Sequence, residues 1–361
     1  MECQDKSEVL RVETEESIYE IEFGQIQIEI TGRCNMACEH CRASHELHKD
    51  MPVDQIVKIL RFARRYSPNY KEVVISGGEP LIHRDFPDIL NAVRENGGES
   101  IFLSTNGSLL EEEYLHQISK LQFKRFTVSV SLDSTNAQVH DLFRNYSGAF
   151  SGAVRALRLV AERGSPGIIA SARVTLQPDQ IQSMEEITDF VFRLGCNRIS
   201  LSSIYPSGRS IDRPEFWMTL EQKKQFLEKV YALREAYPTT FQISTNDPLK
   251  CLVRDVCDDV GSGDEVVFDG CPAAAVTFNV GANGDMTPCA LMNLPMFNVF
   301  GLTVDEIAGR YRESDIVKNM LDMNLRGKCS ICDKKYRCGG CRARALARNG
   351  HYLAEDPDCW L

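Results

Sequence analysis

Short apolar runs alternate with amphipathic patterns from residue 25 to about residue 203. Six runs have the length and composition of buried strands, at 25–30, 72–76, 100–104, 126–132, 168–176 and 198–203. Four segments between them repeat apolar residues every three to four positions and are predicted helices, at 52–66, 86–96, 151–164 and 183–195. This strand–helix alternation predicts an α/β fold with a parallel sheet and outer helices, either doubly wound or barrel-like.

Polar and glycine-rich segments follow the first four predicted strands directly. They are GRCNMACEHCRAS (32–44), SGGEP (76–80), STNGS (104–108) and LDST (132–135). In parallel α/β folds the functional loops lie at the carboxyl ends of the strands. We therefore expect these four segments to meet at one end of the sheet and to form the site.

Cysteine is the most informative residue type. The 361 residues include 14 cysteines, and Cys34, Cys38 and Cys41 lie in the first of these loops. Thiolates hold four-iron clusters, and three of them leave one iron open to a ligand from outside the protein. A zinc site would need a fourth ligand, for which His40 and His45 are near in sequence, and buried thiols without metal are the third alternative. The CxxxCxxC spacing favours the open iron–sulfur cluster.

Charge and hydropathy exclude several classes of protein. The net charge is −10, from 41 Lys and Arg against 51 Asp and Glu, which argues against nucleic-acid binding. No apolar run reaches the roughly 18–20 residues that span a bilayer, and the charged N-terminus is no signal peptide. We therefore expect a cytoplasmic protein without a membrane partner, whose cysteines serve metal or redox chemistry rather than disulfides.

The cysteine loop resembles the signature of the radical S-adenosylmethionine (SAM) superfamily. The resemblance implies a partial (β/α)6 TIM-like barrel over residues 25–235, after an N-terminal tail at 1–24. It implies that Cys34, Cys38 and Cys41 hold a 4Fe–4S cluster whose fourth iron is chelated by the amino and carboxylate groups of SAM. The reduced cluster then cleaves SAM to methionine and a 5′-deoxyadenosyl radical, which abstracts hydrogen from a substrate.

Three further segments resemble parts of this family that contact SAM. SGGEP resembles the GGEP motif, whose backbone meets the SAM amino group, and glycine lets backbone approach a ligand closely. In SLD (131–133) the serine would touch the ribose, and in HDLFRNYSGAF (140–150) the arginine would pair with the SAM carboxylate or lie solvated on the surface. Asn106 is either a SAM contact or a turn residue. The expected SAM-binding residues are Gly77, Gly78, Glu79, Asn106, Ser131 and Arg144.

A second set of cysteines comprises Cys271, Cys289, the run CSICDKKYRCGGC (329–341) and Cys359. It resembles a SPASM domain, whose pattern is C-x(9–15)-G-x4-C, then C-x2-C-x5-C-x3-C, then a last C. With a bridging segment it would occupy residues 236–361 and carry two auxiliary 4Fe–4S clusters, so that the chain holds three. One departure from the pattern is that two residues, not three, separate Cys338 from Cys341. Taken alone, the paired CxxC elements would favour zinc. By resemblance the first cluster binds Cys271, Cys289 and Cys341, and the second binds Cys329, Cys332, Cys338 and Cys359. Either Cys257 or Cys251 would be the fourth ligand of the first cluster, or that cluster has an open iron able to bind substrate.

The substrate class is less sharply defined by the sequence. A ribosomally made peptide that is crosslinked, oxidised or epimerised is the leading expectation. Since only about 24 residues precede the first strand, we expect either that a separate protein binds a leader peptide or that no leader is needed. EHCRAS and CGGCRARALA also resemble enzymes that decarboxylate haem precursors, and a carbohydrate or aminocyclitol oxidase or epimerase is a further alternative. Ala290, where a sulfatase-maturing enzyme has aspartate, weighs against that branch.

Two further expectations concern partners and the non-enzyme alternative. A flavodoxin or ferredoxin is the electron donor that the family resemblance implies. From another functional class, an iron–sulfur electron carrier or scaffold would have the clusters but would not cleave SAM. The SAM-side motifs favour the enzyme.

Overall fold

The computed structural model describes residues 8–42, 49–67, 69–70, 72–253 and 270–361. Its strands are β1 Leu10–Glu13, β2 Ile18–Ile21, β3 Gln25–Thr31, β4 Glu72–Gly77, β5 Ser100–Thr105, β6 Arg125–Ser131, β7 Ile168–Leu176, β8 Arg198–Ser203, β9 Gln242–Ser244, β10 Thr277–Val280, β11 Asp285–Thr287 and β12 Phe297–Asn298. Its α-helices are α1 Val53–Tyr66, α2 Phe86–Glu95, α3 Glu112–Lys120, α4 Ala137–Arg144, α5 Ala149–Arg163, α6 Met184–Arg193, α7 Leu220–Ala236, α8 Val304–Glu313, α9 Asp315–Leu321, α10 Lys335–Cys338 and α11 Arg342–Asn349.

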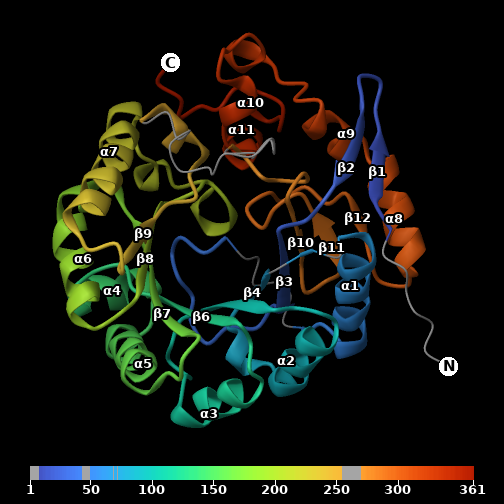
Figure 1. The fold of residues 1–361 in the computed structure, drawn as a ribbon. Coiled ribbons are helices and arrows are strands. Elements are labelled where there is room, and N and C mark those ends of the chain that lie inside the picture. The colour runs from blue at the N-terminus through green and yellow to red at the C-terminus, as the bar shows by residue number, and fades with distance from the viewer. Residues whose placement is uncertain (1–7, 43–48, 68, 71, 254–269) are drawn as a thin grey trace.

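Ten strands form one sheet in the order β12-β11-β10-β3-β4-β5-β6-β7-β8-β9. Strands β3 to β9 run parallel to their neighbours, and helices α1 to α7 lie around the outside of the sheet (Figure 1). The predicted α/β barrel fold is therefore confirmed. The six predicted strands correspond to β3–β8, and the four predicted helices correspond to α1, α2, α5 and α6.

The two faces of the barrel strands differ in chemistry. In β3 the side chains of Ile26, Ile28 and Ile30 belong to the hydrophobic core. In β7 the alternate positions Ala172 and Val174 belong to the same core, which lies between the sheet and the helices. The residues between these positions face the barrel interior, and they are largely polar.

The C-terminal region extends the barrel sheet. Strand β10 pairs in parallel with β3, and β11 and β12 continue in antiparallel fashion. The ring of Phe278 in β10 lies 4.7 Å from that of Phe23 and 5.8 Å from that of Phe62 in α1. Aromatic packing of this kind joins the segment firmly to the barrel. Helices α10 and α11 fill the ring of helices between α7 and α9 (Figure 1).

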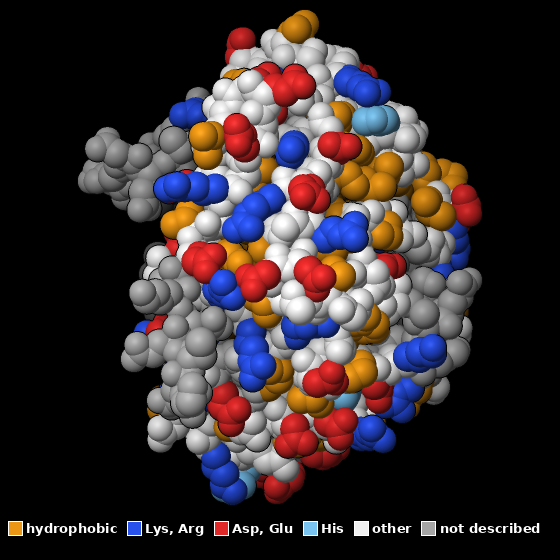
Figure 2. Space-filling model, turned by 90° about the vertical axis from the view of Figure 1, so that its right-hand side faces the viewer, with side chains coloured by type: hydrophobic (Ala, Val, Ile, Leu, Met, Phe, Trp, Pro, Cys, Tyr) orange, Lys and Arg blue, Asp and Glu red, His pale blue; other side chains and the backbone are white. Residues whose placement is uncertain are grey.

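The N-terminal region has more structure than a tail. Residues 10–21 contain the antiparallel pair β1–β2, with Leu10 opposite Ile21. Leu10 and Val12 are fully buried, and the hairpin lies beside α8 (Figure 1). On the face shown in Figure 2, acidic and basic side chains are interspersed rather than gathered by sign. No helix in the described part of the chain has the length and apolarity needed to cross a membrane.

Candidate active site

The loops at the carboxyl ends of the barrel strands surround one pocket. It contains about 1030 Å³ of space free of protein atoms, part of which is open solvent. Three of the four segments that were expected to meet contribute to its wall, with Cys34, Gly77 and Asn106 as examples. The fourth segment, LDST, does not line the pocket itself, but the residue directly before it does: Ser131, the last residue of β6.

The three cysteines of the first loop all line this pocket. Burial is the main cause that raises the pKa of Cys34 to about 11, and it also raises that of Cys38. A buried thiolate needs a positive partner, and iron supplies one, so the donor set fits an iron–sulfur cluster. Among the described residues, no three His, Cys, Asp or Glu side chains are grouped around a single ion position. A four-iron cluster does not need that grouping, because each thiolate binds a separate iron.

The two histidines considered as zinc ligands have other surroundings. His45 lies outside the described residues. The ring of His40 lies along the pocket wall and stacks on Phe143, with centroids 4.1 Å apart and planes 12° apart. Burial lowers the pKa of His40 to about 3, so this imidazole is neutral at pH 7.

Gly77 and Gly78 bring the second loop against the cysteine loop. A Cβ atom on Gly78 would lie 2.0 Å from the carbonyl oxygen of Arg33, and one on Gly77 would lie 2.3 Å from that of Thr31. Gly77 also has φ +142°, a backbone conformation that favours glycine. The Gly78 N–H donates to the Thr31 carbonyl at 2.8 Å. The glycines are therefore needed for contact between the loops as well as for a surface open to a ligand.

Glu79 does not line the pocket, although the sequence comparison with GGEP suggested a SAM contact. Its buried carboxylate accepts hydrogen bonds from the Asn106 N–H and the Thr105 hydroxyl, both at 2.7 Å, and from the Leu81 N–H at 3.2 Å. Burial raises the pKa of Glu79, and these donors counteract the rise. The residue ties the β4 loop to the β5 loop.

Asn106 lines the pocket and is also a turn residue. Its side-chain oxygen accepts from the Ser108 N–H at 2.9 Å, and its amide nitrogen donates to Asn35 at 2.9 Å. The second of these bonds connects the β5 loop to the cysteine loop. The two alternatives weighed for this residue are therefore compatible.

Arg144 is a buried partner of the cluster loop and not a solvated surface residue. It is 7% exposed, and its Nε and Nη2 lie 2.7 and 2.6 Å from Asp133 Oδ2. Its Nη1 donates to Cys38 Sγ at 3.8 Å. Burial would raise the pKa of Asp133, but the charge of Arg144, followed by the two histidines His140 and His40, outweighs it and lowers that pKa.

The C-terminal cysteines form two groups. Cys329, Cys332, Cys338 and Cys359 line a small apolar cavity. In the other group, burial and then the neighbouring Cys271 raise the pKa of Cys289 to about 12, and the same two causes raise that of Cys341. Cys257 lies outside the described residues. Cys251 is hydrogen-bonded to Cys338. It therefore lies at the group that contains Cys338 and not at the group of Cys271, Cys289 and Cys341.

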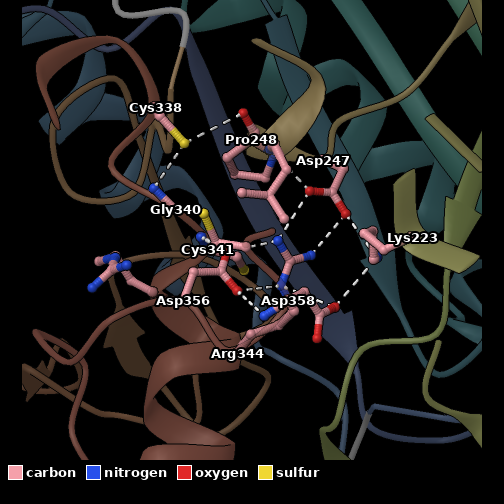
Figure 3. A network of polar contacts seen from close by, with 12 residues as sticks. Lys223, Asp247, Pro248, Cys338, Gly340, Cys341, Arg344, Asp356 and Asp358 are labelled. Carbon is pink, nitrogen blue, oxygen red and sulfur yellow. Dashed lines mark hydrogen bonds and ion pairs between the residues drawn. The ribbon is translucent and has the colours of Figure 1, made fainter. Parts of the chain in front are cut away.

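A buried ion network joins the barrel to the C-terminal cysteines (Figure 3). Arg344 of α11 binds Asp247 through Nη1 at 2.7 Å and Asp356 through Nη2 at 2.7 Å. Lys223 of α7 lies 3.0 Å from Asp247. Asp356 also accepts from the Cys341 N–H at 2.6 Å, which fixes this cysteine relative to the barrel.

The sequence analysis missed two charged residues of this region, Asp133 and Arg173. Arg173 lines the pocket from β7. Its signal was the alternation of Ser171, Arg173 and Thr175 with apolar residues in a strand expected to be buried. That pattern indicates a polar barrel interior. The pairing of Asp133 with Arg144 across eleven residues has no comparable signal in the sequence.

The fold, the cysteine loop and the glycine loop together resemble those of a radical SAM enzyme. Residues 28–191 match the family model of the Radical SAM superfamily, in agreement with the resemblance of the cysteine loop to that family's signature. Its cofactors are therefore SAM and the iron–sulfur cluster of that family.

Relatives extend the similarity over almost the whole chain. The AdoMet-dependent heme synthase of Methanosarcina barkeri is 27% identical over 347 residues, which is 92% of this chain and 94% of the relative. The mycofactocin maturase MftC of Mycolicibacterium smegmatis is 26% identical over 340 residues, 92% of this chain and 81% of the relative. The structure of Streptococcus suis SuiB bound to its precursor peptide SuiA has the same fold, with a TM-score of 0.74, 18% identity and coverage of 95% and 77%.

Proposed function

We propose that Cys34, Cys38 and Cys41 hold the 4Fe–4S cluster and that SAM binds beside it in the pocket. The observation that carries this proposal is that the three thiols line the same pocket as Gly77 and Gly78. When bound, the cluster and SAM supply a radical that abstracts a hydrogen atom from the substrate. The walls of the pocket orient the substrate and limit the access of water to the reacting atoms.

The side chains around the cluster loop have distinct roles in this proposal. Ser131 contacts the SAM ribose, and Glu79 supports the loop from behind. Arg144 donates a hydrogen bond to Cys38 through Nη1, because its other two nitrogens already bind Asp133. An N–H that donates to a cluster thiolate stabilises its negative charge and tunes the cluster potential.

We propose two auxiliary 4Fe–4S clusters at the C-terminal cysteines. The apolar cavity lined by one group of four supports a complete cluster there. For the other cluster we propose Cys271, Cys289 and Cys341, with Cys257 as the fourth ligand. The hydrogen bond of Cys251 to Cys338 argues against Cys251 in that role.

The substrate class that we favour is a tetrapyrrole haem precursor with carboxylate side chains. The similarity to the Methanosarcina heme synthase covers 92% of this chain and 94% of that protein, which supports a common type of substrate. The pocket wall also contains Arg173, and arginine is the side chain suited to bind carboxylates.

A ribosomally made peptide is the second candidate. Its support is the fold shared with SuiB, which was solved with its precursor peptide bound. An electron donor of the flavodoxin or ferredoxin type completes either reaction, and a separate leader-binding protein belongs to the peptide alternative.

An anaerobic assay tests the substrate class. Reconstituted, dithionite-reduced protein is incubated with SAM and Fe-coproporphyrin III, a tetrapyrrole with propionate side chains, and 5′-deoxyadenosine and porphyrin mass are followed. We expect porphyrin-dependent 5′-deoxyadenosine and a porphyrin of lower mass, both lost in Cys34→Ala. SAM cleavage with an unchanged porphyrin mass would reject the haem precursor and leave the peptide candidate.

A further inference from the structure

Arg42 joins the cysteine loop of the barrel to the loop that carries Cys289. It directly follows Cys41, lines the pocket, and donates through Nη1 to the carbonyl oxygen of Ala290 at 2.8 Å. Ala290 directly follows Cys289. In the proposed function Cys41 and Cys289 bind different clusters. Arg42 therefore links a segment that holds the barrel cluster to a segment that holds the first auxiliary cluster.

The hydrogen bonds around Arg42 hold this link in a defined place. Its Nη1 also binds Oε1 of Glu29 in β3 at 2.6 Å. The carbonyl oxygen of Cys289 accepts from the Thr287 hydroxyl at 3.0 Å and from the Met292 N–H at 3.1 Å, so the loop that carries Cys289 is a compact turn. Hydrogen bonds from a charged donor are stronger than those between neutral groups. The position of the guanidinium beside both loops is therefore well determined.

Both cysteines lie within the electrostatic reach of the Arg42 guanidinium. Burial would lower its pKa, but Glu29, followed by the charges of Cys41 and Cys289, outweighs burial and raises that pKa. In turn, Arg42 is one of the groups that limit the rise which burial causes in the pKa of Cys289. The side chains of Arg42 and Glu29 are 26% and 16% exposed, so solvent and salt screen these interactions less than they screen those of surface ions.

A cation at this place favours the reduced form of a cluster on either side. A 4Fe–4S cluster gains one negative charge when it is reduced, and its potential depends on nearby charge and hydrogen bonds. The positive charge of Arg42 stabilises the added electron, and the negative charge of Glu29 opposes that effect. The two side chains therefore act in opposite directions on the same potentials.

We propose that Arg42 is shared by two clusters, and that its charge raises the reduction potentials of both the barrel cluster and the first auxiliary cluster. Glu29 offsets part of this charge and holds the guanidinium in place. The inference rests on the proposed function, because it takes Cys41 and Cys289 as cluster ligands. It adds to that function the side chain that connects the two cluster sites electrostatically.

Redox titrations followed by EPR measure the two potentials directly. The EPR signals of the reconstituted wild type are first assigned with Cys34→Ala and Cys289→Ala, each of which lacks a ligand of one of the two clusters. Binding of SAM provides a second assignment, because it changes the signal of the cluster with the open iron. The readout is a potential, and it does not depend on turnover or on knowledge of the substrate.

Variants of both charges and a matched control are then titrated. Arg42→Gln should lower both potentials by at least about 59 mV, a tenfold change in a one-electron equilibrium constant. Arg42→Lys keeps the charge and should lie between Arg42→Gln and wild type. Glu29→Gln should raise both potentials, because the cation then lacks its counter-charge. Arg125→Gln also breaks an Arg–Glu pair, at the amino end of β6 and away from the cysteine loop, and should leave both potentials unchanged.

Opposite shifts in the two variants distinguish an electrostatic role from a structural one. Iron content and SAM affinity within twofold of wild type show that a variant is folded and loaded. If Arg42→Gln loses iron, the rise expected in Glu29→Gln decides. A fall in Glu29→Gln, a shift of one cluster alone, or unchanged potentials in both Arg42→Gln and Glu29→Gln would overturn the inference.

The same samples separate this inference from the proposed function. Full iron and both EPR signals with unchanged potentials would reject the shared role of Arg42 and leave the cluster assignment intact. If Cys289→Ala keeps all of its iron and all EPR signals, no first auxiliary cluster is bound there. The cluster assignment and the inference would then both fail.

Discussion

At the scale of single residues, the site depends on charges that are buried and matched. Asp133 is 1% exposed, accepts from Arg144, and accepts the Thr175 N–H at 2.9 Å. It therefore connects the α4 arginine that touches Cys38 to β7. The position of Arg144 beside the cluster loop follows from this pairing, because an unpaired guanidinium would not remain buried.

Asp133→Asn should be strongly destabilising. It leaves the Arg144 cation buried without its carboxylate, and removal of one partner of a buried pair costs about 3–5 kcal/mol. Urea unfolding of the iron-free protein, followed by far-UV circular dichroism, measures the loss. The double variant Asp133→Asn/Arg144→Gln should recover part of it. If Asp133→Asn changes the free energy of unfolding by less than about 1 kcal/mol, the pair Asp133–Arg144 does not hold the cysteine loop in place.

At the scale of elements, the contact between the β4 loop and the cysteine loop determines cluster assembly. Gly78→Ala places a methyl group on the Arg33 carbonyl, 2.0 Å from the ideal Cβ position. Because backbone cannot move aside as a side chain can, we expect the cysteine loop to shift and reconstituted iron to fall by about the four irons of one cluster. The matched control is Gly309→Ala in α8, where nothing lies within 4 Å. Equal iron in both variants would contradict the role of Gly78.

The ion network between α7, α11 and the loop at Asp247 should make the stability of the protein depend on pH. Burial would raise the pKa of Asp247, but the charges of Arg344 and Lys223 outweigh it and hold that pKa below its usual value. The stability it contributes is therefore complete above the unfolded pKa of about 3.9 and is lost as pH falls through the lower folded value. Below about pH 4, the urea midpoint of the iron-free wild type should fall more steeply with pH than that of Asp247→Asn. Parallel curves would exclude this contribution.

The sequence predicted the elements that have regular patterns and missed those that depend on pairing. Strands β3 to β8 were predicted because each is an apolar run of ordinary strand length followed by polar loop residues. Strands β9 to β12 have two to four residues each, too few for a periodic pattern, and they form because they pair with existing edges. The β1–β2 hairpin in the segment expected to be a tail also has strands of only four residues, and these two strands pair with each other in a separate sheet.

The candidate site divides in a similar way. The cysteines and the glycines of the loops were identified from their spacing, because their chemical role depends on that spacing. The surroundings of Glu79 and Arg144 were not predictable, because their partners are distant in sequence or are backbone groups. Arg173 could have been found from the alternating polar residues of β7.

At the scale of the whole molecule, the C-terminal region and the barrel form one sheet with cysteine groups at its edge. In the account proposed here the protein holds three clusters, about twelve irons in all. Cys332→Ala should lose about four of these irons and retain the ability to cleave SAM, because its group lies apart from the barrel pocket. Iron and sulfide analysis with a SAM-cleavage assay checks this. Unchanged iron content would show that this cysteine group holds no cluster.

The proposed function requires that the three cysteines of the barrel loop hold a cluster that cleaves bound SAM. The most direct test is formation of 5′-deoxyadenosine by the anaerobically reconstituted protein on reduction with dithionite, with Cys34→Ala and Cys196→Ala compared to wild type. Cys196 is a buried thiol outside the cysteine groups, so its variant is the control. The account predicts 5′-deoxyadenosine from wild type and Cys196→Ala and none above background from Cys34→Ala. Iron-loaded wild type that forms no 5′-deoxyadenosine would contradict it.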